Sequence, residues 1–319
     1  MNPALDVLLQ EARRLESSGP WPFVTRLTLD HERLGRFTIP SRAHRKGIFT
    51  LQPATRSRLI RCLWMPDKLN WWIGIIFAVG SFLFGLGSVL ALAPQLASAL
   101  RMDATAVNAV FFAGSIPFST AAYLQLYQAA NAPGFARPET PGPRGRRFIG
   151  WRPHEIGWLA CVLQFAGTLL FNVNTFDAIL PGLTWLGQDL IVWVPDLAGS
   201  ILFLVSGYLF FIEAGHSYWS WRPSNLIWAL NFFNLLGCVA FMLSALFAFI
   251  PRSSAGFPVE ALVFTLLGAV GFFAGSVLML PETASEQDTP TAQAGNGTRS
   301  AASCDLKNDN PPSKDYRTK

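Results

Sequence analysis

Long apolar runs separated by short polar stretches dominate the pattern of this chain. Each run is close to the roughly 20 residues that an α-helix needs to cross the hydrocarbon of a bilayer. Lipid offers backbone groups no hydrogen-bond partner, and unbroken runs of this length without alternation exclude strands. The pattern therefore predicts an all-α integral membrane fold with six transmembrane helices, near residues 72–95, 105–128, 156–176, 190–212, 225–250 and 259–280.

The composition agrees with lipid as the main solvent, because only 14% of the residues are charged, against about 25% in ordinary soluble domains. A net charge of +5 would also suit a nucleic-acid partner, so the placement of the basic residues decides. With the amino terminus inside, 23 of the 25 Lys and Arg fall in inner segments, and only Arg101 and Arg252 lie outside. This asymmetry predicts an inner cell membrane protein with both termini in the cytoplasm and no nucleic-acid partner.

A repeated motif stands before each odd-numbered run. It reads Trp, any residue, Pro, two residues, Leu or Ile, any residue, Trp, and a glycine follows fourteen residues after the proline. Proline suits the first turn of a helix, tryptophan the headgroup boundary, and glycine the close approach of two helices. The motif positions are Trp64, Pro66, Trp71 and Gly80; Trp151, Pro153, Trp158 and Gly167; and Trp221, Pro223, Trp228 and Gly237.

The even-numbered runs share a weaker Ala-Gly-Ser core, at 113–115, 198–200 and 274–276. Together the two signals predict three tandem two-helix repeats, at 64–130, 151–213 and 221–282. Successive copies enter the membrane in the same direction, so we expect a rough threefold axis along the membrane normal and a closed ring of helices.

The membrane domain is expected to span residues 64–282, between two polar segments. Residues 1–63 form a basic cytoplasmic segment whose cluster Arg42, Arg45 and Lys46 suits anionic lipid headgroups or a cytoplasmic protein partner. Residues 283–319 have the low hydrophobicity of a disordered cytoplasmic tail.

Polar side chains inside the apolar runs mark a candidate polar pocket. Positions at spacings of three and four share one helical face, and that face carries Gln164 in the third run and Asn231 and Asn234 in the fifth. One interpretation is a polar pocket or solute path. The other interpretation is hydrogen bonding between packed helices, at about 1 kcal/mol per bond. Polar residues within spans more often serve this second purpose.

Asp196 completes the candidate pocket as the one acid that lies away from the ends of a predicted run. A carboxylate within a membrane is a functional hypothesis by default. Pro195 precedes it, however, so Asp196 would equally suit the first turn of a helix at the outer surface, where the helix dipole stabilises it.

Signals for catalysis are missing from the sequence. We find no phosphate-binding glycine loop, nucleophile elbow, dinucleotide fingerprint or HExxH motif. Glu213 and His216 have helical spacing but fall short of a metal site. The sequence therefore predicts no catalytic residue, no cofactor and no metal, and leans away from an enzyme.

Two glycine-rich stretches resemble the YrhK-like family of bacterial membrane proteins: Val79-Gly80-Ser81-Phe82-Leu83-Phe84-Gly85-Leu86-Gly87-Ser88 and Ala198-Gly199-Ser200-Ile201-Leu202-Phe203-Leu204-Val205-Ser206-Gly207. The resemblance covers the membrane part and implies a bacterial multi-pass membrane location, without a catalytic residue.

Two functions remain in view. The leading interpretation is a non-enzymatic scaffold or partner-binding protein whose basic segment meets lipid or protein. The alternative is a small-solute or ion transporter or channel, in which Gln164, Asp196, Asn231 and Asn234 face a shared cavity.

Overall fold

Six long apolar helices make up most of the part of the protein that the structure describes. The computed structural model describes residues 14–31, 35–47, 62–135, 145–180, 188–249 and 259–285. Each of the six is long and apolar enough to cross a membrane, the fourth from Ile191 in the preceding π-helical turn η2 (Gln188–Trp193). They are α3 (Leu69–Leu92), α5 (Ala104–Asn131), α6 (Ile156–Asp177), α8 (Val194–Gly215), α9 (Leu226–Phe247) and α10 (Val259–Ser285). The prediction of a six-span, multi-pass membrane protein is confirmed.

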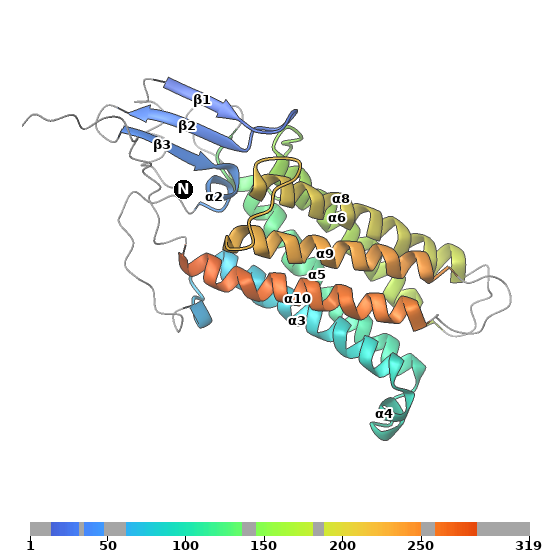
Figure 1. The fold of residues 1–319 in the computed structure, drawn as a ribbon. Coiled ribbons are helices and arrows are strands. Elements are labelled where there is room, and N and C mark those ends of the chain that lie inside the picture. Colours follow the sequence, from blue (N-terminus) through green and yellow to red (C-terminus); the bar gives the residue numbers. More distant parts are fainter. Residues whose placement is uncertain are drawn as a thin grey trace, which may run out of the picture.

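The six helices form a closed ring in chain order. Each one contacts the helix before and the helix after it, and α10 returns to contact α3. Consecutive helices run in opposite directions, and the short helix α4 (Pro94–Ala99) lies between α3 and α5 at one end (Figure 1). We call that end the far end. The opposite end is the sheet end, because it carries the small β-sheet described below (Figure 1).

Phenylalanines fill the middle of the ring, while Leu, Val and Ile face outward. The outward side chains include Val79, Leu169 and Leu236, each at least 45% exposed. Lipid is as apolar as these side chains, so the exposure costs nothing in a bilayer. The buried central phenylalanines are Phe77, Phe84, Phe118, Phe171, Phe203, Phe241 and Phe272.

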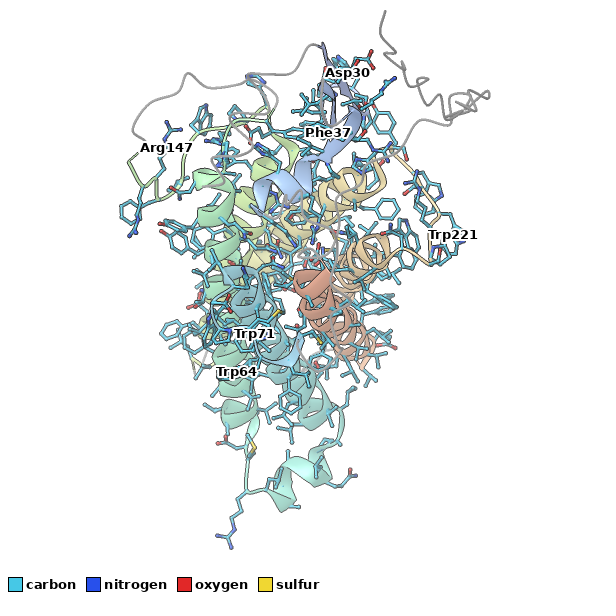
Figure 2. The ribbon with its side chains drawn as sticks, turned by 90° about the vertical axis from the view of Figure 1, so that its left-hand side faces the viewer. Asp30, Phe37, Trp64, Trp71, Arg147 and Trp221 are labelled. Atoms are coloured by element: carbon cyan, nitrogen blue, oxygen red, sulfur yellow. The ribbon has the colours of Figure 1, made fainter. Side chains whose placement is uncertain are left out.

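The tryptophans of the sequence motif adopt one arrangement three times. The two rings of each motif meet edge to face, with centroids 5.7, 5.5 and 5.1 Å apart. The second tryptophan is buried each time and donates its indole N–H to a backbone carbonyl eight or nine residues upstream. The first is exposed, and Figure 2, which looks onto the sheet end, places Trp64 and Trp221 on different sides of the ring.

The motif glycines lie where two helices touch. A Cβ on Gly80 would come within 2.7 Å of Phe118, and one on Gly167 within 2.7 Å of Phe203. A Cβ on Gly237 would be 3.1 Å from the carbonyl of Gly268, next to Phe272. The contact in α10 therefore falls seven positions before the Ala-Gly-Ser core that the sequence pattern singled out.

A three-stranded antiparallel sheet precedes the ring, in the order β1 (Arg14–Ser18), β2 (Arg26–His31) and β3 (Gly35–Pro40). Leu27, Leu29, Phe37 and Ile39 alternate along β2 and β3, and they are buried with Phe135, which follows α5. The all-α prediction is corrected here: the fold is mostly helical but includes this sheet. The predicted disordered tail beyond Ser285 lies outside the described residues.

Candidate functional site

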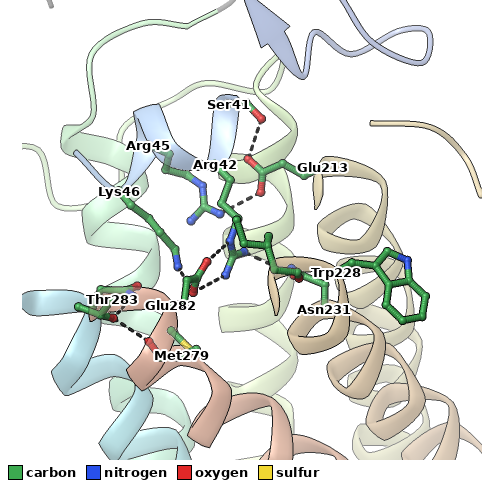
Figure 3. Close-up of polar contacts among 12 residues, drawn as sticks. Ser41, Arg42, Arg45, Lys46, Glu213, Trp228, Asn231, Met279, Glu282 and Thr283 are labelled. Carbon is green, nitrogen blue, oxygen red and sulfur yellow. Dashed lines mark hydrogen bonds and ion pairs between the residues drawn. The ribbon is translucent and has the colours of Figure 1, made fainter. Parts of the chain in front are cut away.

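A cluster of buried charges joins the N-terminal segment to the ring at the sheet end (Figure 3). The short helix α2 (Ser41–Arg45) follows β3 directly and packs against α6 and α8. It brings three cations to the ring, and Glu213 at the end of α8 and Glu282 near the end of α10 meet them there. These five side chains, Arg42, Arg45, Lys46, Glu213 and Glu282, are called the charge cluster below.

Glu282 is the most heavily engaged acid of the charge cluster. Arg42 binds it through two nitrogens, at 2.7 Å to Oε1 and 3.1 Å to Oε2, while Lys46 Nζ lies 2.6 Å from Oε2. The side chain of Glu282 is fully buried. Paired, forked hydrogen bonds of this kind are the geometry in which a buried carboxylate and guanidinium offset their desolvation.

Glu213 forms the second pair. Arg45 Nη2 lies 2.9 Å from Glu213 Oε2, and Ser41 Oγ donates to Oε1 at 3.1 Å. Gly157 at the start of α6 provides the room, since a Cβ there would collide with the guanidinium of Arg45 and the carboxylate of Glu213. A glycine is therefore required where α6 passes this pair.

The electrostatics of α2 follow from these partners. Burial alone would lower the pKa of Arg42 and of Arg45. The carboxylate of Glu282 outweighs burial for Arg42, and that of Glu213 does so for Arg45, so both pKa values lie above their ordinary value. Both guanidinium groups therefore remain charged at every physiological pH.

His216 lies beside the charge cluster and links the ring to the sheet. It caps α8 in a left-handed conformation, with φ 56°, and hydrogen-bonds the backbone of Thr25 at the start of β2. Burial, with the nearby positive charge of Arg26, lowers the pKa of His216 to about 4. The imidazole is therefore neutral at pH 7.

A small cavity lies inside the ring next to Arg42. Its volume is about 30 Å³, room for about one water molecule. Gln164, Asn231 and Asn234 line it, together with Gln125. Asn231 Oδ1 accepts from Arg42 at 3.4 Å, whereas the Oε1 atoms of Gln125 and Gln164 have no partner among the described residues.

A second and much larger cavity occupies the far end of the ring. Its volume is about 730 Å³, and Asp196 lines it. The carboxylate of Asp196 is half-buried near the start of α8 and is hydrogen-bonded by the side chain of Asn174. Most lining side chains are apolar; the polar ones besides Asp196 are Ser98, Asp103, Asn108, Asn174, Thr175, Ser244 and Thr265.

Three phenylalanines close the bottom of the far-end cavity. Phe84, Phe171 and Phe241 each follow a motif glycine by four residues, and all three line the cavity. The ring of Phe241 lies 6.0 Å from that of Phe84 and 5.7 Å from that of Phe171. The same three rings, with Phe118 and Phe203, also line a further cavity of only about 10 Å³, so little open space is found where these phenylalanines meet.

The structure thus divides the four residues of the predicted polar pocket. Gln164, Asn231 and Asn234 meet at the small cavity, and Asp196 lies at the far-end cavity. The sequence did not reveal the intramolecular partners of Arg42, Arg45 and Lys46. The available signal was the presence of Glu213 and Glu282, acids at the same end of two even-numbered helices.

Comparison with known proteins adds no relative. No family model, no curated protein and no solved structure matches this chain. The resemblance to the YrhK-like family therefore stays a prediction, and function has to be argued from the two cavities and the charge cluster.

Proposed function

We propose that this protein is a small-solute transporter of a cell membrane, with the far-end cavity as its solute site. One observation carries the proposal: a ring of six membrane-crossing helices encloses a cavity of about 730 Å³ that contains a carboxylate. Cavities of about 300–1,000 Å³ with a few placed polar groups are typical of small-molecule sites. An acid within a span is costly and usually serves a function.

The closed sheet end favours a transporter that works by alternating access and disfavours an open channel. The three floor phenylalanines and the buried charge cluster occupy the ring below the far-end cavity. A solute bound above them would cross only if the helices moved and exchanged one closed end for the other. Glu213 and Glu282 end two even-numbered helices, so such a movement would separate them from α2.

Topology is part of the same proposal. The positive-inside pattern favours cytoplasmic termini, so the sheet end would face the cytoplasm and the far-end cavity the outside. The three matching tryptophan pairs and the glycine contacts at Gly80, Gly167 and Gly237 support three tandem two-helix repeats. The scaffold role, in which residues 1–63 bind lipid or a cytoplasmic protein, stays a prediction. Residues other than Arg42, Arg45 and Lys46 would have to bind that partner, because these three cations are buried.

The proposal is tested by filling the far-end cavity. Ala248 lines it, while Leu246 on the same helix is 54% exposed on the outer surface. Full-length wild-type protein, Ala248→Trp and Leu246→Trp would be reconstituted in liposomes and given a panel of cationic, neutral and anionic radiolabelled solutes.

We expect at least one solute to accumulate above protein-free liposomes, with uptake lost in Ala248→Trp and kept in Leu246→Trp. Uptake that survives Ala248→Trp would overturn the site. No uptake of any solute by the folded wild-type protein would overturn transport.

A further inference from the structure

The charges that line the far-end cavity have one sign. Among the described lining residues the ionisable side chains are the acids Asp103 and Asp196, and no Lys, Arg or His lines the cavity. Arg101 lies nearby in the chain but is exposed and is not part of the lining. A concave site with low-dielectric walls and one sign of charge concentrates ions of the opposite sign. The cavity therefore favours a cation.

Asp196 is the carboxylate with hydrogen-bonding capacity to spare. Asp103 is already committed, because its Oδ1 caps α5 by accepting from the backbone N–H of Ala106 at 2.8 Å. Asp196 has the side chain of Asn174 as its partner in the described part of the chain, with no ion pair to a cation there. An ionised carboxylate accepts about four hydrogen bonds, so Asp196 can still receive a charged donor.

The floor of the cavity suits the same kind of ligand. The rings of Phe84, Phe171 and Phe241 gather there, and their mutual contacts are edge to face. Aromatic faces attract an ammonium or a similar cation, most strongly when water is excluded. They also offer an apolar surface to the body of a ligand.

The size and the walls of the cavity point to a ligand larger than a metal ion. Leu90, Met102, Val107 and Leu262 contribute apolar wall, and the volume of about 730 Å³ would hold many water molecules around a bare ion. The described residues contain no group of three or more His, Cys, Asp or Glu that could hold a metal ion, whereas Ca²⁺ sites gather several carboxylate and other oxygen ligands. An organic cation fills the space and matches the apolar walls.

We propose that the far-end cavity binds an organic cation, an amine or quaternary onium ion with an apolar body. Its charge pairs with Asp196, and its body lies on Phe84, Phe171 and Phe241. This proposal rests on the far-end cavity being the solute site, and it names the class of solute.

The test uses ions of one shape and opposite charge. Tritiated tetraphenylphosphonium is bound to the purified full-length protein in detergent micelles, and unlabelled tetraphenylphosphonium, neutral triphenylphosphine oxide and anionic tetraphenylborate compete. Binding to Ala248→Trp measures the background from the micelle.

We expect saturable binding that only the cation displaces well, and an affinity at least about tenfold weaker in Asp196→Asn, because one charged partner is lost. Glu260→Gln, an exposed acid at the start of α10, should bind like the wild type.

The outcomes separate the solute class from the solute site. Should tetraphenylborate or triphenylphosphine oxide compete as well as the cation, or Asp196→Asn bind as tightly as wild type, the cationic class is overturned, while sensitivity to Ala248→Trp would still support the site. The second outcome concerns the site. Tritiated triphenylphosphine oxide is also bound directly, and if neither it nor tritiated tetraphenylphosphonium binds wild type more tightly than Ala248→Trp, the site is overturned and the proposed function with it.

Discussion

The two ends of the helix ring differ in what fills them. At the sheet end α2 inserts three cations against two buried carboxylates, and the cavity that remains is about 30 Å³. At the far end the cavity is about 730 Å³, and mostly apolar side chains line it, together with the half-buried carboxylate of Asp196 and the exposed one of Asp103. The same six helices form both ends, so the N-terminal segment accounts for the closed one.

The stability of this fold depends more on the sheet end than on the far end. A buried ion pair adds modestly to stability while it is complete, but the loss of one partner leaves an uncompensated charge and costs several kcal/mol. Small hydroxyl and apolar groups at the far end carry no such penalty. Substitutions at the sheet end should therefore affect folding, and substitutions at the far end should affect binding.

The largest effect is expected from Glu282→Gln. The change removes the buried carboxylate that pairs with Arg42 and Lys46, and we expect the free energy of unfolding to fall by about 3–5 kcal/mol. Denaturant titration in detergent micelles, followed by tryptophan fluorescence, measures it. The exposed acid Glu260 on the same helix gives the control, Glu260→Gln. Equal stability of the two variants would contradict a sheet end held by the charge cluster.

A pH-dependent effect of intermediate size is expected at His216. Its pKa is about 4 in the folded protein against an ordinary 6.5, so between these values the unfolded chain takes up a proton that the folded one does not. The free energy of unfolding should therefore decrease as the pH falls from about 6.5 to about 4, by about 1.4 kcal/mol per pH unit at most.

His216→Asn isolates this contribution, because asparagine tolerates the left-handed conformation of the residue. Denaturant titrations across that pH range should give a flatter dependence for the variant than for the wild type. Parallel curves would contradict the lowered pKa of His216 in the folded protein.

A smaller loss is expected where helices touch near the middle of the ring. Gly80→Ala would press its Cβ within 2.7 Å of Phe118, whereas Gly85 on the same helix has its nearest neighbours at 3.9 Å. Overpacking of this kind costs about 1–3 kcal/mol, so Gly80→Ala should lower the melting temperature in micelles. The matched change Gly85→Ala should leave it unaltered. The reverse order would refute the close α3–α5 contact.

The smallest effect is expected from Gln164→Leu. The Oε1 atom of Gln164 has no partner among the described residues, and removing an unsatisfied buried polar group is neutral or stabilising by less than about 1 kcal/mol. Asn231→Leu is the contrast, because it deprives Arg42 of an acceptor and should cost about 1–3 kcal/mol. Equal losses in the two variants would mean that Gln164 has a partner.

The membrane-crossing helices could be predicted from the sequence because each is an apolar run of sufficient length. The predicted run at 156–176 and the observed α6, Ile156–Asp177, agree closely. The sheet was missed although Leu27, Leu29, Phe37 and Ile39 alternate with polar residues. Two short alternating segments are weak signals beside six long apolar runs.

The site was harder to predict because its partners are far apart in the chain. Arg42 and Glu282 are 240 positions apart, and a basic cluster by itself equally suits anionic lipid. Asp196 was grouped with Gln164 and Asn231 on polarity alone. The direction of the helices separates them. Asp196 lies near the start of α8, which is at the far end, whereas Asn231 lies near the start of α9, which is at the sheet end.

The central claim is that the ring is hollow at the far end and sealed at the sheet end. It is tested most directly by the rates at which Thr265→Cys and Gln164→Cys react with a charged methanethiosulfonate. Both variants would be made with Cys62, Cys161, Cys238 and Cys304 replaced by alanine and placed in micelles, where the reagent reaches both ends. Thr265 lines the far-end cavity and Gln164 the small cavity. We expect fast modification of Thr265→Cys and almost none of Gln164→Cys. Equal rates at the two positions would contradict a ring that is open at the far end and sealed at the sheet end.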